Sequence, residues 1–268
     1  MTNHLECILC RGHQFKSVYL HDAFVVLKCN ECGLVFQSTR SVNINTLDDY
    51  YTHRPTEECL DWKGDNRRIG DIADTLADRY PQGKLLDVGC GSGKFIYEMS
   101  NRGIECTGVE PNIAQATYAK NLGFRVRTEI FKDGLFESEY FDVITFLQVM
   151  EHLPNPIQAL RTAYLYLRPG GMVVADVPSY NNPRILVFRV LGIKRIVKGD
   201  FIKPHLFYFT PATLSTIVKQ SGFLIDRIDV GRYNEKFGPN LILKKIDVLA
   251  KIFGIGGIVI YGGKSATS

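Results

Sequence analysis

Leu85-Leu-Asp87-Val-Gly89-Cys90-Gly91-Ser-Gly93 is the stretch of sequence that decides the fold. It begins with a short apolar run, which is typical of a buried strand. Three glycines then follow at alternate positions. Glycine destabilises regular structure, so this spacing indicates a turn whose backbone something approaches closely. The stretch therefore predicts a strand, a glycine-rich turn and a helix, with a binding site at the turn.

An acidic residue at the end of the next apolar run points to a nucleoside-containing cofactor. Glu110 lies 23 residues after Asp87, and a carboxylate at that place can accept hydrogen bonds from both hydroxyls of a ribose. A dinucleotide fingerprint requires a third glycine where this chain has Lys94. The glycine pattern is therefore weak evidence for a nicotinamide cofactor.

Outward from this stretch, apolar runs alternate with helical segments, which predicts an α/β fold with parallel strands. Ile69, Ile72, Ala73 and Leu76 have the spacing of a helix with one buried face. Prolines indicate three further helix starts. The expected strands are Leu85–Val88, Cys106–Val109, Phe141–Leu147, Met172–Val177 and Gly257–Tyr261, the fourth following a turn at 168–171, and the prolines are Pro111, Pro156 and Pro211.

Two cysteine pairs near the N-terminus predict a zinc site. Cys7-x2-Cys10 and Cys29-x2-Cys32 are separated by 18 residues, a spacing that lets four thiolates bind one Zn²⁺. Four thiolates leave no open position, so the metal would be structural, and about 50 residues need it in order to fold. Two redox-active pairs are the alternative. We expect a separate module at residues 1–52, with strands at Ser17–Leu20 and Phe24–Lys28.

The motifs together resemble those of class I S-adenosylmethionine-dependent methyltransferases. The resemblance covers most of residues 53–268. The N-terminal cysteines also resemble those of a subgroup that has a zinc ribbon before the catalytic domain. Many members of this subgroup methylate sugars and other secondary metabolites. It implies a Rossmann-like, seven-stranded, mostly parallel sheet with helices on both faces and a reversed last strand. The matching segments are Asp87–Gly93, Gly108–Asn112, Phe141–Ile144, Glu151–Pro156, Leu167–Gly171 and, for the ribbon, Cys29–Phe36 followed by Asp49–Tyr51.

The resemblance also implies roles for individual residues. Asp87 with the turn residues Gly89, Cys90 and Gly91 would bind the methionine end of the cofactor, and Glu110 the ribose. Gln148 would face the same pocket, with Ile130 and Phe131 beside the adenine. One departure lies in the ribbon, where Arg11 occupies a position at which the subgroup usually has glycine.

Two histidines are candidates for the general base that a hydroxyl or carbon acid requires. His205 lies in Pro204-His-Leu-Phe-Tyr-Phe-Thr210 and resembles a histidine found at this place in the family. His152 follows Glu151, a region that binds a divalent metal in related catechol-type enzymes. The alternatives are a structural loop histidine for His205 and a helix-capping role for the Glu151–His152 pair.

Composition and charge narrow the remaining function classes. The chain has 268 residues, 45% of them apolar, and a net charge of +4, which is less basic than a dedicated nucleic-acid binder. Seven cysteines and no apolar leader favour a reducing, cytoplasmic setting. We expect a small-molecule methyl acceptor. RNA base methylation, and a cofactor-binding adaptor without activity, are the alternatives. Residues 183–202 are basic and amphipathic, which fits a lid over the site better than a helix on a membrane beside a lipid or quinone acceptor.

Overall fold

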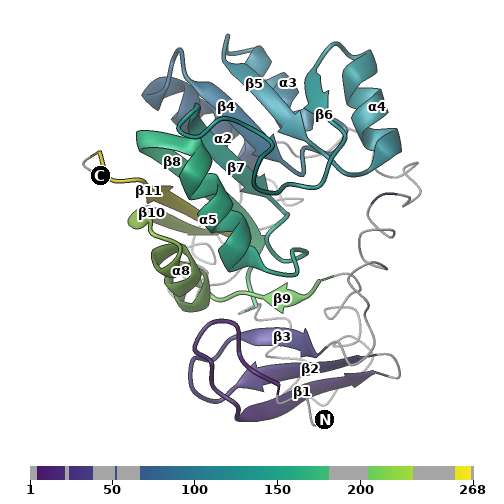
Figure 1. Ribbon diagram of the computed structural model, residues 1–268, viewed down its shortest axis with the longest axis vertical. Helices are drawn as coiled ribbons and strands as arrows, with labels where there is room; N and C mark the ends of the chain where they lie inside the picture. Colours follow the sequence, from purple (N-terminus) through teal and green to yellow (C-terminus); the bar gives the residue numbers. More distant parts are fainter. Residues whose placement is uncertain are drawn as a thin grey trace, which may run out of the picture.

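The computed structural model describes residues 5–21, 24–38, 52, 67–180, 205–231 and 257–266. Its largest element is a seven-stranded sheet with the strand order β10-β11-β8-β7-β4-β5-β6 (Figure 1). The last strand, β11, runs antiparallel to both of its neighbours, whereas β8, β7, β4, β5 and β6 are parallel. The strands are β4 Lys84–Val88, β5 Glu105–Val109, β6 Arg125–Arg127, β7 Phe141–Leu147, β8 Leu167–Pro178, β10 Leu224–Gly231 and β11 Gly257–Gly263.

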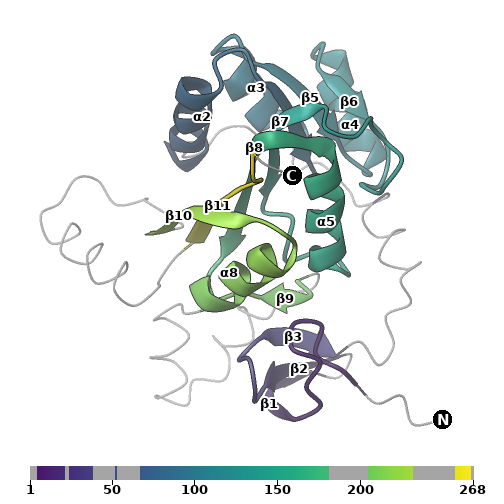
Figure 2. The same cartoon turned by 60° about the vertical axis from the view of Figure 1, so that its left-hand side comes forward.

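Helices cover both faces of this sheet, as the class I resemblance implies. Adjacent residues of a strand point to opposite faces, so Leu85 packs against α2, α3 and α4, while Leu86 lies in the core formed with α5 and α8. Figure 2 shows α5 and α8 together on one side of the sheet and α2 on the other. The helices are α2 Arg67–Arg79, α3 Lys94–Ser100, α4 Ile113–Asn121, α5 Pro156–Tyr166 and α8 Pro211–Gln220.

Two of the three proline-marked helix starts are confirmed. Pro156 and Pro211 occupy the first turns of α5 and α8, where Asn155 and Thr210 are the capping residues. The prediction for Pro111 was wrong by two residues, because α4 begins at Ile113 and the side chain of Asn112 accepts a hydrogen bond from the Gln115 N–H. A capping side chain fixes a helix start more strongly than a nearby proline.

The predicted start of the strand at Met172 was also wrong. β8 begins at Leu167 and includes residues 168–171, which we expected to form a turn. Within the described residues, β6 and β10 complete the two edges of the sheet. No helix in this part of the chain has the length and apolar character needed to span a bilayer. The expected lid at 183–202 lies outside the described residues, as does Asp49–Tyr51.

A second, four-stranded sheet joins the N-terminal ribbon to the rest of the chain. β1 Phe15–His21 and β2 Phe24–Cys29 confirm the two predicted strands, and β3 Val35–Ser38 pairs with β2. The fourth strand is β9 Phe207–Tyr208, which pairs antiparallel with β3. In Figure 1, β9 lies between the ribbon and the large sheet. The short strand just after His205 is therefore part of the ribbon's sheet.

Candidate active site

The glycine-rich turn after β4 has the backbone conformation that only glycine adopts without strain. Gly89, Gly91 and Gly93 have φ angles of 69°, 54° and 87°. A side chain at Gly89 would also collide with its surroundings, since an added Cβ would lie 2.6 Å from Val149 Cγ2. The Gly89 N–H donates to the Val109 carbonyl at 2.7 Å, which ties the turn to the end of β5. The predicted strand, turn and helix are confirmed.

Glu110 lies beside this turn with a buried carboxylate. Its Oε2 accepts a hydrogen bond from the Gly91 N–H at 2.8 Å, and its Oε1 accepts one from the Asn112 N–H at 2.8 Å. Burial raises the pKa of Glu110. Each carboxylate oxygen can accept a second hydrogen bond, so both oxygens can also bind the hydroxyls of a ribose.

Asp87 is a second buried carboxylate, at the carboxyl end of β4. Its Oδ1 accepts a hydrogen bond from Thr145 Oγ1 on β7 at 2.6 Å. Burial, with a smaller contribution from the charge of Glu110, raises the pKa of Asp87 to about 7. A cationic ligand nearby would favour the ionised form of both groups.

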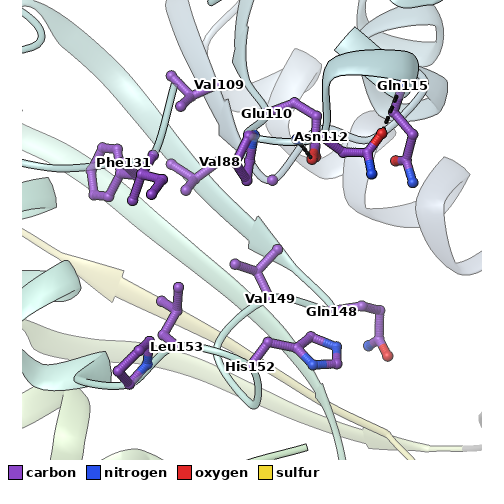
Figure 3. Close-up of a pocket in the computed structure, with 14 residues that line it drawn as sticks. Val88, Val109, Glu110, Asn112, Gln115, Phe131, Gln148, Val149, His152 and Leu153 are labelled. Carbon is purple, nitrogen blue, oxygen red and sulfur yellow. Dashed lines mark hydrogen bonds between the residues drawn. The ribbon is translucent and has the colours of Figure 1, made fainter. Parts of the chain in front are cut away.

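A cavity of about 240 Å³ lies at the carboxyl ends of β4, β5 and β7. This is the edge at which open α/β sheets bind ligands. Figure 3 shows Glu110 and Asn112 on one side of the cavity, and Gln148 and His152 on the opposite side. The remaining lining is mainly apolar: Val88, Val109, Pro111, Ile130, Phe131, Val149, Leu153 and Pro154, with Gly89 and Gln115. An apolar chamber with a buried carboxylate beside a glycine turn fits an adenosyl group.

Cys90 is placed differently from the other turn residues. Its side chain belongs to the core beneath α3, and a Cβ added to Gly108 on β5 would lie only 2.4 Å from Cys90 Sγ. Burial raises the pKa of this thiol. The side chain thus packs the turn against β5, and only the Cys90 backbone remains to contact a cofactor.

Gln148, at the end of β7, has an unusual backbone. Its φ of 61° is left-handed although it is not glycine, and such strained residues cluster at functional sites. Its backbone N–H donates to the Asp176 carbonyl at 2.8 Å and its side-chain Nε2 donates to the same oxygen at 3.3 Å. The carboxylate of Asp176 in turn forms a partly buried ion pair with Arg68 of α2. These contacts hold Gln148 at the wall of the cavity.

His152 lines the cavity on the same side as Gln148 and forms a cluster with Glu151 and His205, which are not among the lining residues. The two imidazole rings are 4.7 Å apart between centroids, and His152 Nε2 lies 3.9 Å from Glu151 Oε1. Burial raises the pKa of Glu151 to about 8, and neither of its oxygens has a hydrogen-bond partner among the described residues. Burial lowers the pKa of His205. One ligand atom from each of the three residues lies within 4.8 Å of the others, so they could hold a divalent cation.

The four ribbon cysteines converge as the sequence predicts. The Sγ atoms of Cys7 and Cys32 are 3.5 Å apart, as are those of Cys10 and Cys29, and all four thiols are free. Four sulfurs bound tetrahedrally at about 2.3 Å from zinc would lie about 3.8 Å from one another. The set therefore fits one structural Zn²⁺.

Comparison with known proteins identifies the family. Residues 62–227 match the family described as "Methyltransferase domain". This chain is a member of that methyltransferase family. The ubiquinone biosynthesis O-methyltransferase of Pseudomonas fluorescens is 30% identical over 167 residues, which cover 56% of this chain and 68% of that protein. The enzyme of the same name from Pseudomonas putida is 34% identical over 160 residues, with the same two coverages of 56% and 68%.

Solved structures agree with this methyltransferase fold. A SAM-dependent methyltransferase from Archaeoglobus fulgidus superimposes with a TM-score of 0.54 at 20% identity, covering 73% of this chain and 94% of that one. One from Methanosarcina mazei gives 0.54 at 18% identity and covers 71% and 97%. The predicted class I methyltransferase with S-adenosylmethionine as its cofactor is thus confirmed.

The methyltransferase cavity also contains residues that the sequence did not single out. Asn112 and Gln115 line it from the start of α4, and Val149 and Leu153 line it from the loop after β7. Asn112 carried a usable signal, since it follows Glu110-Pro and is a good capping residue. No local pattern in the sequence indicates the Arg68–Asp176 pair, because the two residues are 108 positions apart.

Proposed function

We propose that this methyltransferase transfers the methyl group of S-adenosylmethionine to a hydroxyl oxygen of a small molecule. The observation that carries the proposal is the Glu151–His152–His205 cluster, whose member His152 lines the cavity opposite Glu110. Oxygen is also the acceptor named for the two Pseudomonas relatives. A sulfonium supplies an already activated methyl group. The protein therefore has to align the acceptor, exclude water and accept a proton.

The cofactor's contacts follow from the geometry of the turn. Glu110 would accept hydrogen bonds from the ribose hydroxyls. The apolar side chains, which include Phe131 and Ile130, would enclose the adenine. Asp87, together with the Gly89, Cys90 and Gly91 backbone, would face the methionine end, with Gln148 beside it. The two buried carboxylates favour a cationic ligand over a neutral one.

His205 is the proposed general base. Burial lowers its pKa, so its imidazole is neutral and able to accept the hydroxyl proton at neutral pH. The acceptor oxygen would form the new bond to the methyl carbon while the carbon–sulfur bond breaks toward sulfur. His152, which lines the cavity itself, would orient the hydroxyl or serve as the base in place of His205.

The same donors support a second role for the cluster. A divalent cation held by Glu151, His152 and His205 would lower the pKa of an acceptor hydroxyl and so reduce the need for a base. The unpartnered Glu151 carboxylate favours this alternative. Calorimetric titration of the protein with Mg²⁺ or Mn²⁺, before and after Glu151→Gln, distinguishes the two roles.

Turnover with a panel of acceptors tests the proposed function. Methyl transfer to a small phenol or sugar hydroxyl supports it, whereas activity on RNA alone would favour the RNA alternative. Cofactor binding without any turnover would favour the adaptor. His205→Ala should reduce turnover by about 100-fold or more and leave the dissociation constant of S-adenosylmethionine unchanged. His13 is an exposed histidine of the ribbon. His13→Ala is therefore the matched control and should change neither turnover nor the dissociation constant of S-adenosylmethionine.

Three further features belong to the proposal. We place the ribbon at residues 1–52 and the catalytic domain at 53–268, with a structural Zn²⁺ bound by Cys7, Cys10, Cys29 and Cys32. The free cysteines fit a cytoplasmic enzyme. If the methyl acceptor is a lipid or a quinone, we expect residues 183–202 to contact the membrane that contains it. Vesicle sedimentation before and after Arg189→Glu, Lys194→Glu and Lys198→Glu tests it.

A further inference from the structure

We propose that Gln37 of the zinc ribbon is a positioning residue, which acts through Leu206 and Tyr208 to hold His205 beside Glu151 and His152. The inference rests on the proposed function, because that function places His205 at the acceptor. It goes further in giving the ribbon a part in methyl transfer besides its own stability.

The contact between ribbon and catalytic part is a shared sheet edge. Val35 pairs with Tyr208 and Phe36 with Phe207. The Gln37 N–H then donates to the Leu206 carbonyl at 2.8 Å, one residue after His205. Two strands separated by more than 160 residues are thereby joined at the residue next to the proposed base.

The Gln37 side chain adds a second contact to the same strand. Its Nε2 donates to the Tyr208 hydroxyl at 3.2 Å, and both residues are buried. Tyr208 also packs on Phe24, Val26 and Val35 of the ribbon, and its ring centroid lies 6.3 Å from that of His205. A buried amide with a buried hydroxyl partner gives a directional contact.

The other side of β9 is attached to the site itself. The N–H groups of Leu206 and Phe207 both donate to the Glu151 carbonyl, at 2.7 and 3.1 Å. The segment 205–208 therefore lies between the ribbon strand β3 and the residue before His152. Displacement of β9 would change the spacing of all three members of the cluster, and a misplacement of about 1 Å can cost up to about 100-fold in rate.

The test compares two glutamines that both join ribbon to catalytic part. Gln37→Leu removes the amide that donates to Tyr208 and keeps the size of the side chain. Gln220→Leu is the matched control, because Gln220 Nε2 on α8 donates to the Leu9 carbonyl of the ribbon at 3.1 Å and so joins the ribbon to α8 rather than to β9. Tyr208→Phe removes the hydroxyl that accepts the hydrogen bond from the Gln37 amide.

We expect Gln37→Leu to lower kcat about tenfold while the dissociation constant of S-adenosylmethionine stays within about twofold. Gln220→Leu should leave kcat unchanged. In the Tyr208→Phe background, Gln37→Leu should have much less effect, since the two act through one contact. Equal losses of kcat in Gln37→Leu and Gln220→Leu, or full additivity with Tyr208→Phe, would overturn the proposal.

Hydrogen–deuterium exchange decides the same question without turnover. Amide exchange in residues 205–209 should rise about tenfold in Gln37→Leu and stay at the wild-type rate in Gln220→Leu. Unchanged exchange in Gln37→Leu contradicts the positioning role. If the wild-type protein methylates no acceptor, the proposed function fails, yet the exchange result still shows whether Gln37 holds β9.

Discussion

Some residues of this protein other than glycine have positive φ angles, which a Cβ disfavours, and Arg11 is one of them. It follows the Cys7–Cys10 knuckle with a φ of 60°, as Gly33 follows the Cys29–Cys32 knuckle with a φ of 75°. The two turns match in their hydrogen bonds also, from Arg11 N–H to the Cys7 carbonyl at 2.8 Å and from Gly33 N–H to the Cys29 carbonyl at 3.0 Å. The ribbon keeps its turn geometry despite the departure from glycine.

Arg11→Gly should therefore stabilise the zinc-loaded ribbon by about 1 kcal/mol, because glycine adopts the left-handed region without a Cβ clash. Denaturant unfolding measures the change. Arg11→Ala is the control, since it removes the guanidinium but keeps the Cβ. A similar gain in Arg11→Ala would mean that the backbone strain is not the cause.

Asp87 gives a prediction for pH. Its pKa in the folded protein is raised from 3.8 to about 7 by burial, so the folded state binds a proton more tightly than the unfolded chain. Stability from this group is complete below about pH 4 and is lost as the pH rises toward about 7. At pH 8, without cofactor, Asp87→Asn should be more stable by on the order of 2 kcal/mol. Thermal unfolding measures this, with the exposed Asp78→Asn as control.

Cofactor affinity should change in the opposite direction at the same residue. The ionised form of Asp87 favours the sulfonium cation, so the dissociation constant of S-adenosylmethionine should fall by about fivefold between pH 6 and pH 8. The demethylated, neutral product should show a smaller dependence. Calorimetry of Asp87→Asn should give weaker binding with no such trend; an unchanged trend would assign it to another group.

At the scale of the elements, caps fix where the helices on the acceptor side begin. Thr210 caps α8 through a reciprocal pair of hydrogen bonds with Thr213, at 3.2 Å from the Thr213 N–H to Thr210 Oγ1 and 2.9 Å from the Thr210 N–H to Thr213 Oγ1. The helix starts at Pro211, six residues after His205. This cap therefore also sets where the strand β9 ends.

Thr210→Ala should cost about 1 kcal/mol of unfolding free energy, since one helical N–H loses its partner. Ser215→Ala in the same helix is the matched control, because the Ser215 hydroxyl only donates to the Pro211 carbonyl of the preceding turn. Chemical denaturation of both variants measures the difference. A cost as large in Ser215→Ala would mean that general helix stability, not the cap, is being measured.

The same scale shows what sequence could predict. The sequence predicts β4, its glycine turn and Glu110, because an apolar strand and a glycine spacing are each visible in a few consecutive residues. β9 has only two residues, Phe207 and Tyr208, and its pairing with β3 depends on a tertiary contact that no local pattern encodes. The convergence of Glu151 with His205 escaped the sequence for the same reason, although each histidine was singled out separately.

For the whole molecule, we expect loss of metal to affect the ribbon and the cofactor cavity differently. The four cysteines lie in the ribbon, whereas the residues that line the cavity all lie between Val88 and Pro154. A strong thiol-competing chelator should release one Zn²⁺ per chain and lower the midpoint of thermal unfolding. The affinity for S-adenosylmethionine should change by less than about twofold. Metal analysis and calorimetry on the same sample check both, and a large loss of affinity would place the metal nearer the cofactor than we expect.

The pairing of β9 with β3 also has a consequence for biosynthesis. Gln37 and its partner Tyr208 are separated by 171 residues. A ribosome that adds about 5–20 residues per second would synthesise the ribbon roughly 10–30 s before β9, the strand that completes the ribbon's sheet. During that interval the edge of β3 lacks its neighbour, and such bare edges attract other chains. Nascent protein should thus be most vulnerable to aggregation midway through translation, when chaperones that shield exposed strands would matter most.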